Sequence, residues 1–258
     1  MSMSPRPPIP SFIPESARFL MHIGRPDEAR ATLARFGAVI VTPSEDWDEE
    51  AKVDHSHLPP VDKRYIGVAE MLTLVGLVWG FVNFGLLLWL PAQLMSEGRD
   101  MAVAAGIIAK SSLIAVPVVV VAAWLYAAWS TKYTLLTMIA VTALGLFALL
   151  ARQMGVPALA DPTLPVALLI IGSTGVISVL LPFAAENYPL HIRGRATGWV
   201  AACSKSGGLF CQIISVLGAV PGIGTAALAI AIPALIALGL VTAYGRETRG
   251  RDLRDLES

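Results

Sequence analysis

Two lysines, Lys110 and Lys205, stand inside long apolar stretches of this chain, and their charge makes them the first candidates for chemistry. A charged side chain near the centre of a bilayer costs at least about 2.5 to 3.5 kcal/mol, so it is a functional candidate by default. No Asp or Glu stands deep in any of these stretches. We therefore expect the lysines to bind an anion, specifically a carboxylate. Two alternatives stay open: the ammonium groups reach the membrane interface, or they pair with acids elsewhere.

Other polar and aromatic residues stand where they could complete such a site. Lys205 and Gln212 lie seven residues apart with small residues between them on the same helix face, so that face could line a cavity. Asn83 follows Trp79 by one helical turn in the first apolar stretch, which would add a hydrogen-bonding group and an aromatic wall. The predicted substrate-binding residues are Trp79, Asn83, Lys110, Lys205 and Gln212.

The sequence does not favour enzymatic, metal or nucleic-acid chemistry. Cys203 and Cys211 are eight residues apart in one apolar stretch, about 12 Å along a helix, which is too far for a disulfide. His55 and His57 have no third ligand nearby, and we interpret them as solvated loop histidines. We find no nucleophile with a base and no Gly-rich phosphate loop, so we expect neither an enzyme nor a cofactor. The basic residues do not interleave with aromatic ones, which argues against a nucleic-acid partner.

The elements that must hold these residues are predicted to be membrane helices. The chain has 258 residues, of which 55% are hydrophobic and 15% charged. Its mean hydropathy is +0.66. Six apolar stretches are each long enough to cross about 30 Å of hydrocarbon, and too long and uniformly apolar for a soluble core. We predict an all-α membrane protein with helices at 67–92, 101–127, 133–152, 163–186, 195–218 and 223–244.

The distribution of basic residues predicts the orientation in the membrane. Fifteen of the nineteen Lys and Arg residues fall on one side of the six stretches, whereas only Arg99 and Arg152 fall on the other. The basic side is expected to be cytoplasmic, which places both termini inside. We therefore expect a multi-pass protein of the plasma (inner) membrane, with the lipid bilayer and a small organic solute as its partners.

The polar ends of the chain flank this membrane part. Residues 1–66 form the predicted cytoplasmic N-terminal segment with short helices, 67–245 the membrane domain and 246–258 a cytoplasmic tail. Pro26 followed by Asp27 and Glu28 predicts the first turn of a helix. Residues 1–10 lack an apolar region, so we expect no cleavable signal peptide. Pro117, Pro182 and Pro233 are predicted to kink their helices, either for gating or simply for packing.

Three motifs in the polar segments resemble those of the major facilitator superfamily, in its sugar-porter-like branch. The first is a variant of P-E-S-P-R-W before the first helix, the second is the loop between the fourth and fifth helices, and the third resembles P-E-T-K-G-R in the tail. Their order and their spacing by helices match the family over nearly the whole chain. The motif residues are Pro14, Glu15, Ser16 and Arg18, then Pro189, Gly194 and Gly198, then Glu247, Thr248 and Gly250.

The resemblance implies the C-terminal half of a twelve-helix transporter that works by alternating access and is coupled to protons. It also implies a cytoplasmic gate formed by Glu186, Arg193 and Arg195, for which a plain solvated loop is the alternative. The other six helices would come from a separate chain or a second copy of this one. A non-transporting membrane subunit or a truncated remnant of a transporter stays open as another function.

Two departures from the family pattern narrow the expected substrate. Residues 129–133 carry one Lys where the family has a cluster of basic residues, so the cytoplasmic charge network is thinner. The paired glutamines of sugar transporters are missing from the first helix, whose residues 79–91 look more like branches that handle organic acids and aromatic metabolites. The resemblance thus disfavours a hexose and favours an organic anion.

Overall fold

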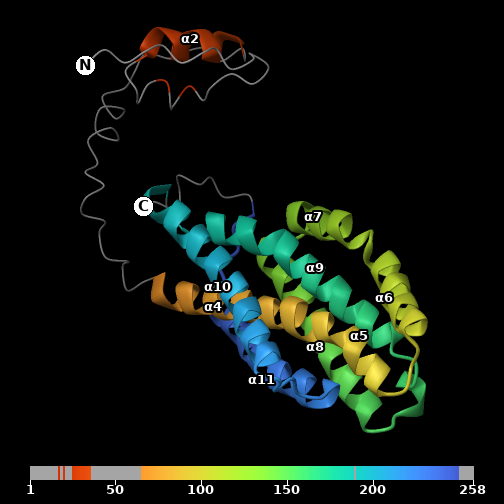
Figure 1. The fold of residues 1–258 in the computed structure, drawn as a ribbon. Coiled ribbons are helices and arrows are strands. Elements are labelled where there is room, and N and C mark those ends of the chain that lie inside the picture. The colour runs from red at the N-terminus through yellow and green to blue at the C-terminus, as the bar shows by residue number, and fades with distance from the viewer. Residues whose placement is uncertain (1–16, 18–19, 21–24, 36–64, 189, 250–258) are drawn as a thin grey trace. The chain divides into compact units, whose positions relative to one another are not determined.

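The computed structural model describes residues 17, 20, 25–35, 65–188 and 190–249, and the chain divides into two compact units at residues 60 and 61 (Figure 1). The first unit contains helix α2 (Pro26–Arg35), which begins where the proline and the two acidic residues predict it. Arg25 donates to Glu28 at 2.7 Å across its first turn. The motif residues Pro14, Glu15, Ser16, Arg18, Pro189 and Gly250 lie outside the described residues.

The second unit is built from long helices joined by short turns (Figure 1). Among the described residues, five helical segments are long and apolar enough to cross a membrane. Another, α10, is 27 residues long and includes the more polar stretch around Lys205 and Gln212. The elements are α4 (Ile66–Gly80), the π-helix η2 (Phe81–Leu86), α5 (Leu87–Ser96), α6 (Met101–Ala115), α7 (Val118–Ala128), α8 (Thr131–Gln153), the 3-10 helix η3 (Pro157–Leu159), α9 (Thr163–Glu186), α10 (Leu190–Val216) and α11 (Ile223–Tyr244).

The helices differ from the prediction in three places. The first span contains the π-helical turn η2 and runs on to Ser96, four residues further than predicted. The second span is broken between α6 and α7 at Pro117, which has no N–H to continue the helix. Pro182 and Pro233, in contrast, lie inside the continuous helices α9 and α11. Helix α10 begins at Leu190, five residues before the predicted start.

Small residues bring the helix backbones together, as the apolar packing of membrane helices requires. Helix α8 packs against both α9 and α11, and α4 packs against α10 and α11 (Figure 1). A Cβ atom added at Gly207 of α10 would lie 2.6 Å from the carbonyl oxygen of Leu77 of α4. A Cβ atom at Gly172 of α9 would collide with Thr142 of α8. The contact at Gly207 brings α10, which carries Lys205, close against α4, which carries Trp79.

Candidate functional site

Lys205 lies above two aromatic rings near the middle of α10. Its Nζ atom is 4.9 Å from the ring centroid of Phe84 and 5.3 Å from that of Trp79. The two rings pack edge to face, with centroids 5.6 Å apart. An ammonium group at this distance is attracted to the electron-rich ring faces. Among the described residues no carboxylate pairs with Lys205, and its side chain stays exposed.

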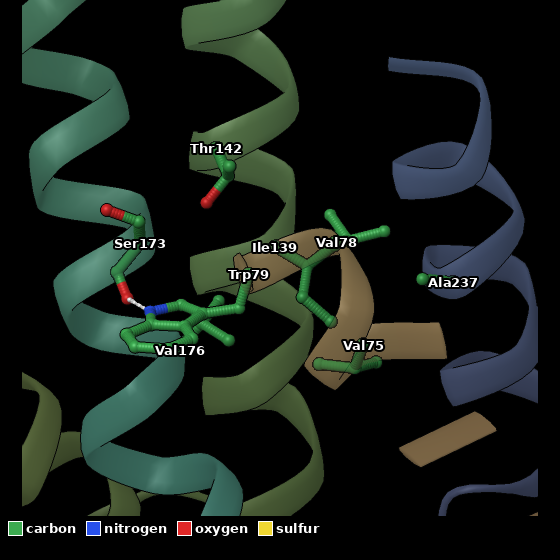
Figure 2. Close-up of a pocket in the computed structure, with 8 residues that line it drawn as sticks. All are labelled: Val75, Val78, Trp79, Ile139, Thr142, Ser173, Val176 and Ala237. Carbon is green, nitrogen blue, oxygen red and sulfur yellow. Dashed lines mark hydrogen bonds between the residues drawn. The ribbon is translucent and has the colours of Figure 1, made fainter. Parts of the chain in front are cut away.

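The indole ring of Trp79 is held by a hydrogen bond from its N–H group to helix α9. Its Nε1 atom donates to the carbonyl oxygen of Ser173 on α9, at 2.9 Å (Figure 2). The indole also borders a small cavity between α4, α8, α9 and α11, whose other walls include Val75, Ile139 and Ala237 (Figure 2). Apart from Trp79, the lining includes only two residues with polar side chains, Thr142 and Ser173, and we assign no ligand to this cavity.

Gln212 and Asn83 contact the backbone around the aromatic pair. Gln212 Nε2 donates to the carbonyl oxygen of Phe84 at 2.5 Å, and Asn83 Nδ2 donates to that of Trp79 at 3.1 Å. A π-helical turn leaves backbone carbonyls without their usual partner, so the amide of Gln212 supplies one. Among the described residues nothing donates to either amide oxygen, and contact with a solute stays a prediction for both residues.

Lys110 lies apart from this group. It is exposed on α6, and its neighbour Ser111 donates to the carbonyl oxygen of Thr163, the first residue of α9, at 3.0 Å. Hydrogen bonds from the Thr163 backbone and side chain lower the pKa of Asp161, with smaller contributions from the charges of Arg99 and Lys110. Lys110 thus lies level with the N-terminal end of α9 and near Asp161 in the loop before it. This position fits the alternative that its ammonium group reaches the interface.

The expected gate residues do not pair with one another. Glu186 Oε2 accepts hydrogen bonds from the Tyr126 hydroxyl at 2.6 Å and from Thr248 Oγ1 at 2.5 Å. Arg193 Nε donates to the carbonyl oxygen of Tyr188 at 3.3 Å, and Arg195 is exposed. Within the described residues no ion pair joins Glu186 to either arginine. A gating role for these three residues stays a prediction. In this structure Glu186 contacts two hydroxyl groups, and Arg193 contacts a backbone carbonyl group.

Glu247 of the tail motif caps helix α8. Its carboxylate accepts hydrogen bonds from the Thr131 backbone N–H at 3.0 Å, from Thr131 Oγ1 at 2.8 Å and from Ser130 Oγ. Burial would raise the pKa of Glu247, but the hydrogen bonds from Ser130 and Thr131 outweigh it and lower the pKa to about 2. A carboxylate at a helix N-terminus is also favoured by the helix dipole. The tail is thereby fastened to the α7–α8 turn.

The remaining motif residues have simpler surroundings. Gly194 and Gly198 lie on α10, where an added Cβ atom at either position would meet nothing within 4 Å. Thr248 is buried, and its hydroxyl contacts both Glu186 and Thr131. Sequence reasoning missed Tyr126 and Phe84. Nothing in the sequence around Tyr126 marks it as a functional residue. Phe84, in contrast, belongs to a local enrichment of aromatic residues around Trp79.

No family model matches this chain. The niacin transporter NiaP of Acinetobacter baylyi is 25% identical over 254 residues, which cover 95% of this chain and 56% of that protein. The putative niacin/nicotinamide transporter NiaP of Bacillus subtilis is 25% identical over 193 residues, or 74% of this chain and 47% of that protein. The chain therefore spans about half the length of the curated relatives it matches. Because these relatives are named as transporters, they agree with the expectation that the chain is not an enzyme.

A solved structure shows the fold. The crystal structure of a double-tryptophan variant of XylE superposes with a TM-score of 0.70 at 20% sequence identity, over 95% of this chain and 54% of that chain. The predicted fold class, a six-helix half of a major facilitator fold, is confirmed by this match. The predicted resemblance to the major facilitator superfamily is confirmed as well. The chain is an integral, multi-pass membrane protein.

Proposed function

We propose that this half of a major facilitator fold belongs to a transporter of small aromatic carboxylates, and that Lys205 binds the carboxylate. The single observation that carries the proposal is the position of the Lys205 ammonium group over the rings of Phe84 and Trp79. The cation is exposed and no described carboxylate neutralises it, so it can accept an anionic partner. The rings beside it offer apolar faces to the remainder of the same solute.

The two matched transporters support a specific member of this class. Both are named for niacin, a pyridine ring that carries one carboxylate. A cation next to two aromatic rings is chemically complementary to such a solute, because the carboxylate binds the ammonium group and the heteroaromatic ring packs against an aromatic face. We propose niacin or a close aromatic acid as the substrate of the complete transporter.

The complete transporter would need a second set of six helices. We propose that these helices are supplied by further sequence, by another chain or by a second copy, and that the substrate lies between the two halves near the membrane midplane. We further propose location in the plasma membrane, both termini on the cytoplasmic side and coupling to protons. The coupling acids are expected in the complementary helices, because no Asp or Glu stands deep in the spans of this chain.

Uptake by proteoliposomes tests the proposal. The chain is reconstituted with its complementary six helices, and uptake of labelled niacin, nicotinamide, benzoate and a hexose is compared. We expect uptake of the two carboxylates, and we expect Lys205→Ala to reduce it by at least about tenfold, which is about 1.4 kcal/mol. Nicotinamide has the same ring without the charge, so its uptake is expected to change much less in this variant.

Lys110→Ala is the matched control, because it removes an equal charge from a position away from the aromatic pair. We expect it to transport niacin like the unaltered protein. Equal loss of transport in the two variants, or full carboxylate uptake by Lys205→Ala, would overturn the assignment of Lys205. Absence of uptake for every solute, despite correct assembly, would favour the non-transporting subunit or remnant.

A further inference from the structure

The indole of Trp79 belongs both to the candidate site and to the wall of the small cavity inside the helix bundle (Figure 2). Lys205 approaches the indole from α10, with its Nζ atom 5.3 Å from the ring centroid. The cavity is lined from other helices: Ile139 comes from α8, Val176 from α9 and Ala237 from α11. The indole therefore borders the candidate site on one side and the cavity on another.

The lining of the cavity does not suit a polar ligand. Its two hydroxyl groups already donate within their own helices, Thr142 Oγ1 to the carbonyl oxygen of Met138 at 2.9 Å and Ser173 Oγ to that of Ile170 at 3.4 Å. The carbonyl oxygen of Ser173 accepts the indole N–H. A buried water molecule needs two to four polar partners. The group best placed to enter the cavity is therefore the indole at its border.

A single hydrogen bond holds the indole, and it leaves the ring one way to move. The indole N–H donates to the carbonyl oxygen of Ser173 at 2.9 Å, which fixes the ring while no solute presses on it. A small tilt about this anchored edge keeps the hydrogen bond. Side chains beside a cavity lack contacts on that side, so a ring that tilts toward it gains dispersion contacts there.

The other neighbours of the indole are packed too closely to move aside. The ring of Phe84 lies against α10, where a Cβ atom added at Gly208 would be 2.6 Å from it. A Cβ atom added at Gly80, next to Trp79, would collide with the carbonyl oxygen of Ser204 on α10. The backbone of α4 is thus held tightly against α10. A solute that presses on the indole displaces it toward the cavity.

We propose that this cavity sets the size of the solute that the site accepts. Ala237 and Val176 are then positioning residues, because they determine how far Trp79 can give way without touching the solute themselves. A ring with one additional methyl group tilts the indole into the cavity while its carboxylate stays at Lys205. The inference rests on the proposed function, since the solute is an aromatic carboxylate, and adds that ring-substituted acids are accepted too.

Uptake of a matched series of acids tests this proposal. The chain is reconstituted in proteoliposomes with its complementary six helices, and the uptake of benzoate is compared with that of its three monomethyl derivatives. We expect the unaltered protein to take up benzoate and at least one methylated acid at comparable rates. Ala237→Val fills the cavity with two methyl groups. We expect it to keep benzoate uptake and to raise the KM for the accepted methylated acids by at least about tenfold, as one additional methylene does in a rigid pocket.

Two further variants make the result independent of a single substitution. Val176→Ile fills the same cavity from α9 and is expected to change the preference in the same direction. Ala229→Val adds the same groups at an exposed position of α11 and is the matched control, which should keep the preference of the unaltered protein. Melting temperatures show whether the two filled variants fold, and filling a cavity is expected to leave them unchanged or to raise them.

The outcomes separate this inference from the proposed function. An unchanged preference in the folded Ala237→Val and Val176→Ile proteins, or an equal change in Ala229→Val, would overturn the role of the cavity and leave carboxylate transport standing. Loss of benzoate uptake together with that of the methylated acids would mean general damage to the site and would also overturn it. If the unaltered protein takes up none of the four acids, the proposed function fails and this inference fails with it.

Discussion

The Nζ atom of Lys205 lies 5.3 Å from the ring centroid of Trp79, and this contact joins α10 to α4. The N–H of the same indole donates to the carbonyl oxygen of Ser173 and joins α4 to α9. An indole that donates from its edge is fixed in orientation, so its ring face is presented at a defined place. The carbonyl oxygen of Ser173 thus influences the position of the Lys205 ammonium group through Trp79, without contacting the lysine itself. Three helices consequently determine where a bound anion would lie.

Replacing Trp79 by Phe separates these two roles of the indole. The aromatic face remains, but the donor to Ser173 is lost, and the free energy of unfolding is expected to fall by about 1 kcal/mol. The affinity for an aromatic carboxylate is expected to fall as well, because the ring is no longer fixed. Thermal unfolding and anion binding in detergent measure the two effects. Trp124→Phe, at a site that is 65% exposed, is the control and should change neither.

The sequence predicted Lys205 and Trp79 but not the contact between them. A lone cation in an apolar stretch is visible without any structure, whereas its partner Phe84 is not. In a regular α-helix a residue five positions after Trp79 points about 140° away from it. The π-helical turn changes this angle and brings both rings toward α10. The amino-acid sequence of residues 81–86 does not predict such a turn.

Six membrane helices were predicted, and within the described residues five helical segments are long and apolar enough to span a membrane, while α10 forms a sixth long helix. Their extents are nearly as predicted, because the length of an apolar stretch is fixed by the thickness of the membrane. Their irregularities were harder to predict. Pro117 breaks its span, but Pro182 and Pro233 lie in continuous helices. The effect of a proline depends on which neighbouring groups satisfy the freed carbonyls, and this is a tertiary property.

The side-chain contacts of the predicted gate residues also depend on tertiary packing and could not be predicted from the sequence. Glu186 and Arg193 are close in sequence, yet a turn around Tyr188 separates α9 from α10 and directs their side chains to different partners. Glu186 instead contacts Tyr126, which is 60 positions earlier in the chain. Only the packing of α7 against α9 could reveal that pair.

Replacing Gln212 by Leu tests its role in supporting the π-helical turn. Leucine keeps a similar volume but cannot donate to the carbonyl oxygen of Phe84, which would be left without this partner. We expect the free energy of unfolding to fall by about 1 to 3 kcal/mol. Ser206→Ala removes an exposed hydroxyl from the same helix and is expected to have little effect. Equal stability of the two variants in a denaturant titration would contradict the role assigned to Gln212.

Two glycines on α10 are expected to respond to alanine in opposite ways. At Gly207 the new methyl group would lie 2.6 Å from the carbonyl oxygen of Leu77, and backbone atoms cannot easily move away. We expect Gly207→Ala to lower stability by about 1 to 3 kcal/mol and to separate α10 from α4. At Gly198 nothing lies within 4 Å of the new group. Gly198→Ala should therefore be neutral or stabilising by up to about 1 kcal/mol, through its higher helix propensity. Melting temperatures of the two variants make the comparison.

The cap that Glu247 places on α8 predicts a loss of stability in acid. Its pKa in the folded chain is about 2, below the ordinary value of 4.5, so the folded state holds the ionised form more strongly than the unfolded state does. A lowered pKa contributes stability that is present above the unfolded value and lost as the pH falls through the folded one. Glu247→Gln is therefore expected to be less stable than the unaltered protein at neutral pH.

The difference between these two proteins is expected to shrink as the pH falls below about 4.5 and to vanish near pH 2, when unfolding is followed by circular dichroism. Glu70→Gln, which removes an exposed carboxylate of α4, measures the general effect of removing a carboxylate from the surface. A difference that stayed constant down to pH 2 would show that Glu247 acts through its shape and not through its charge.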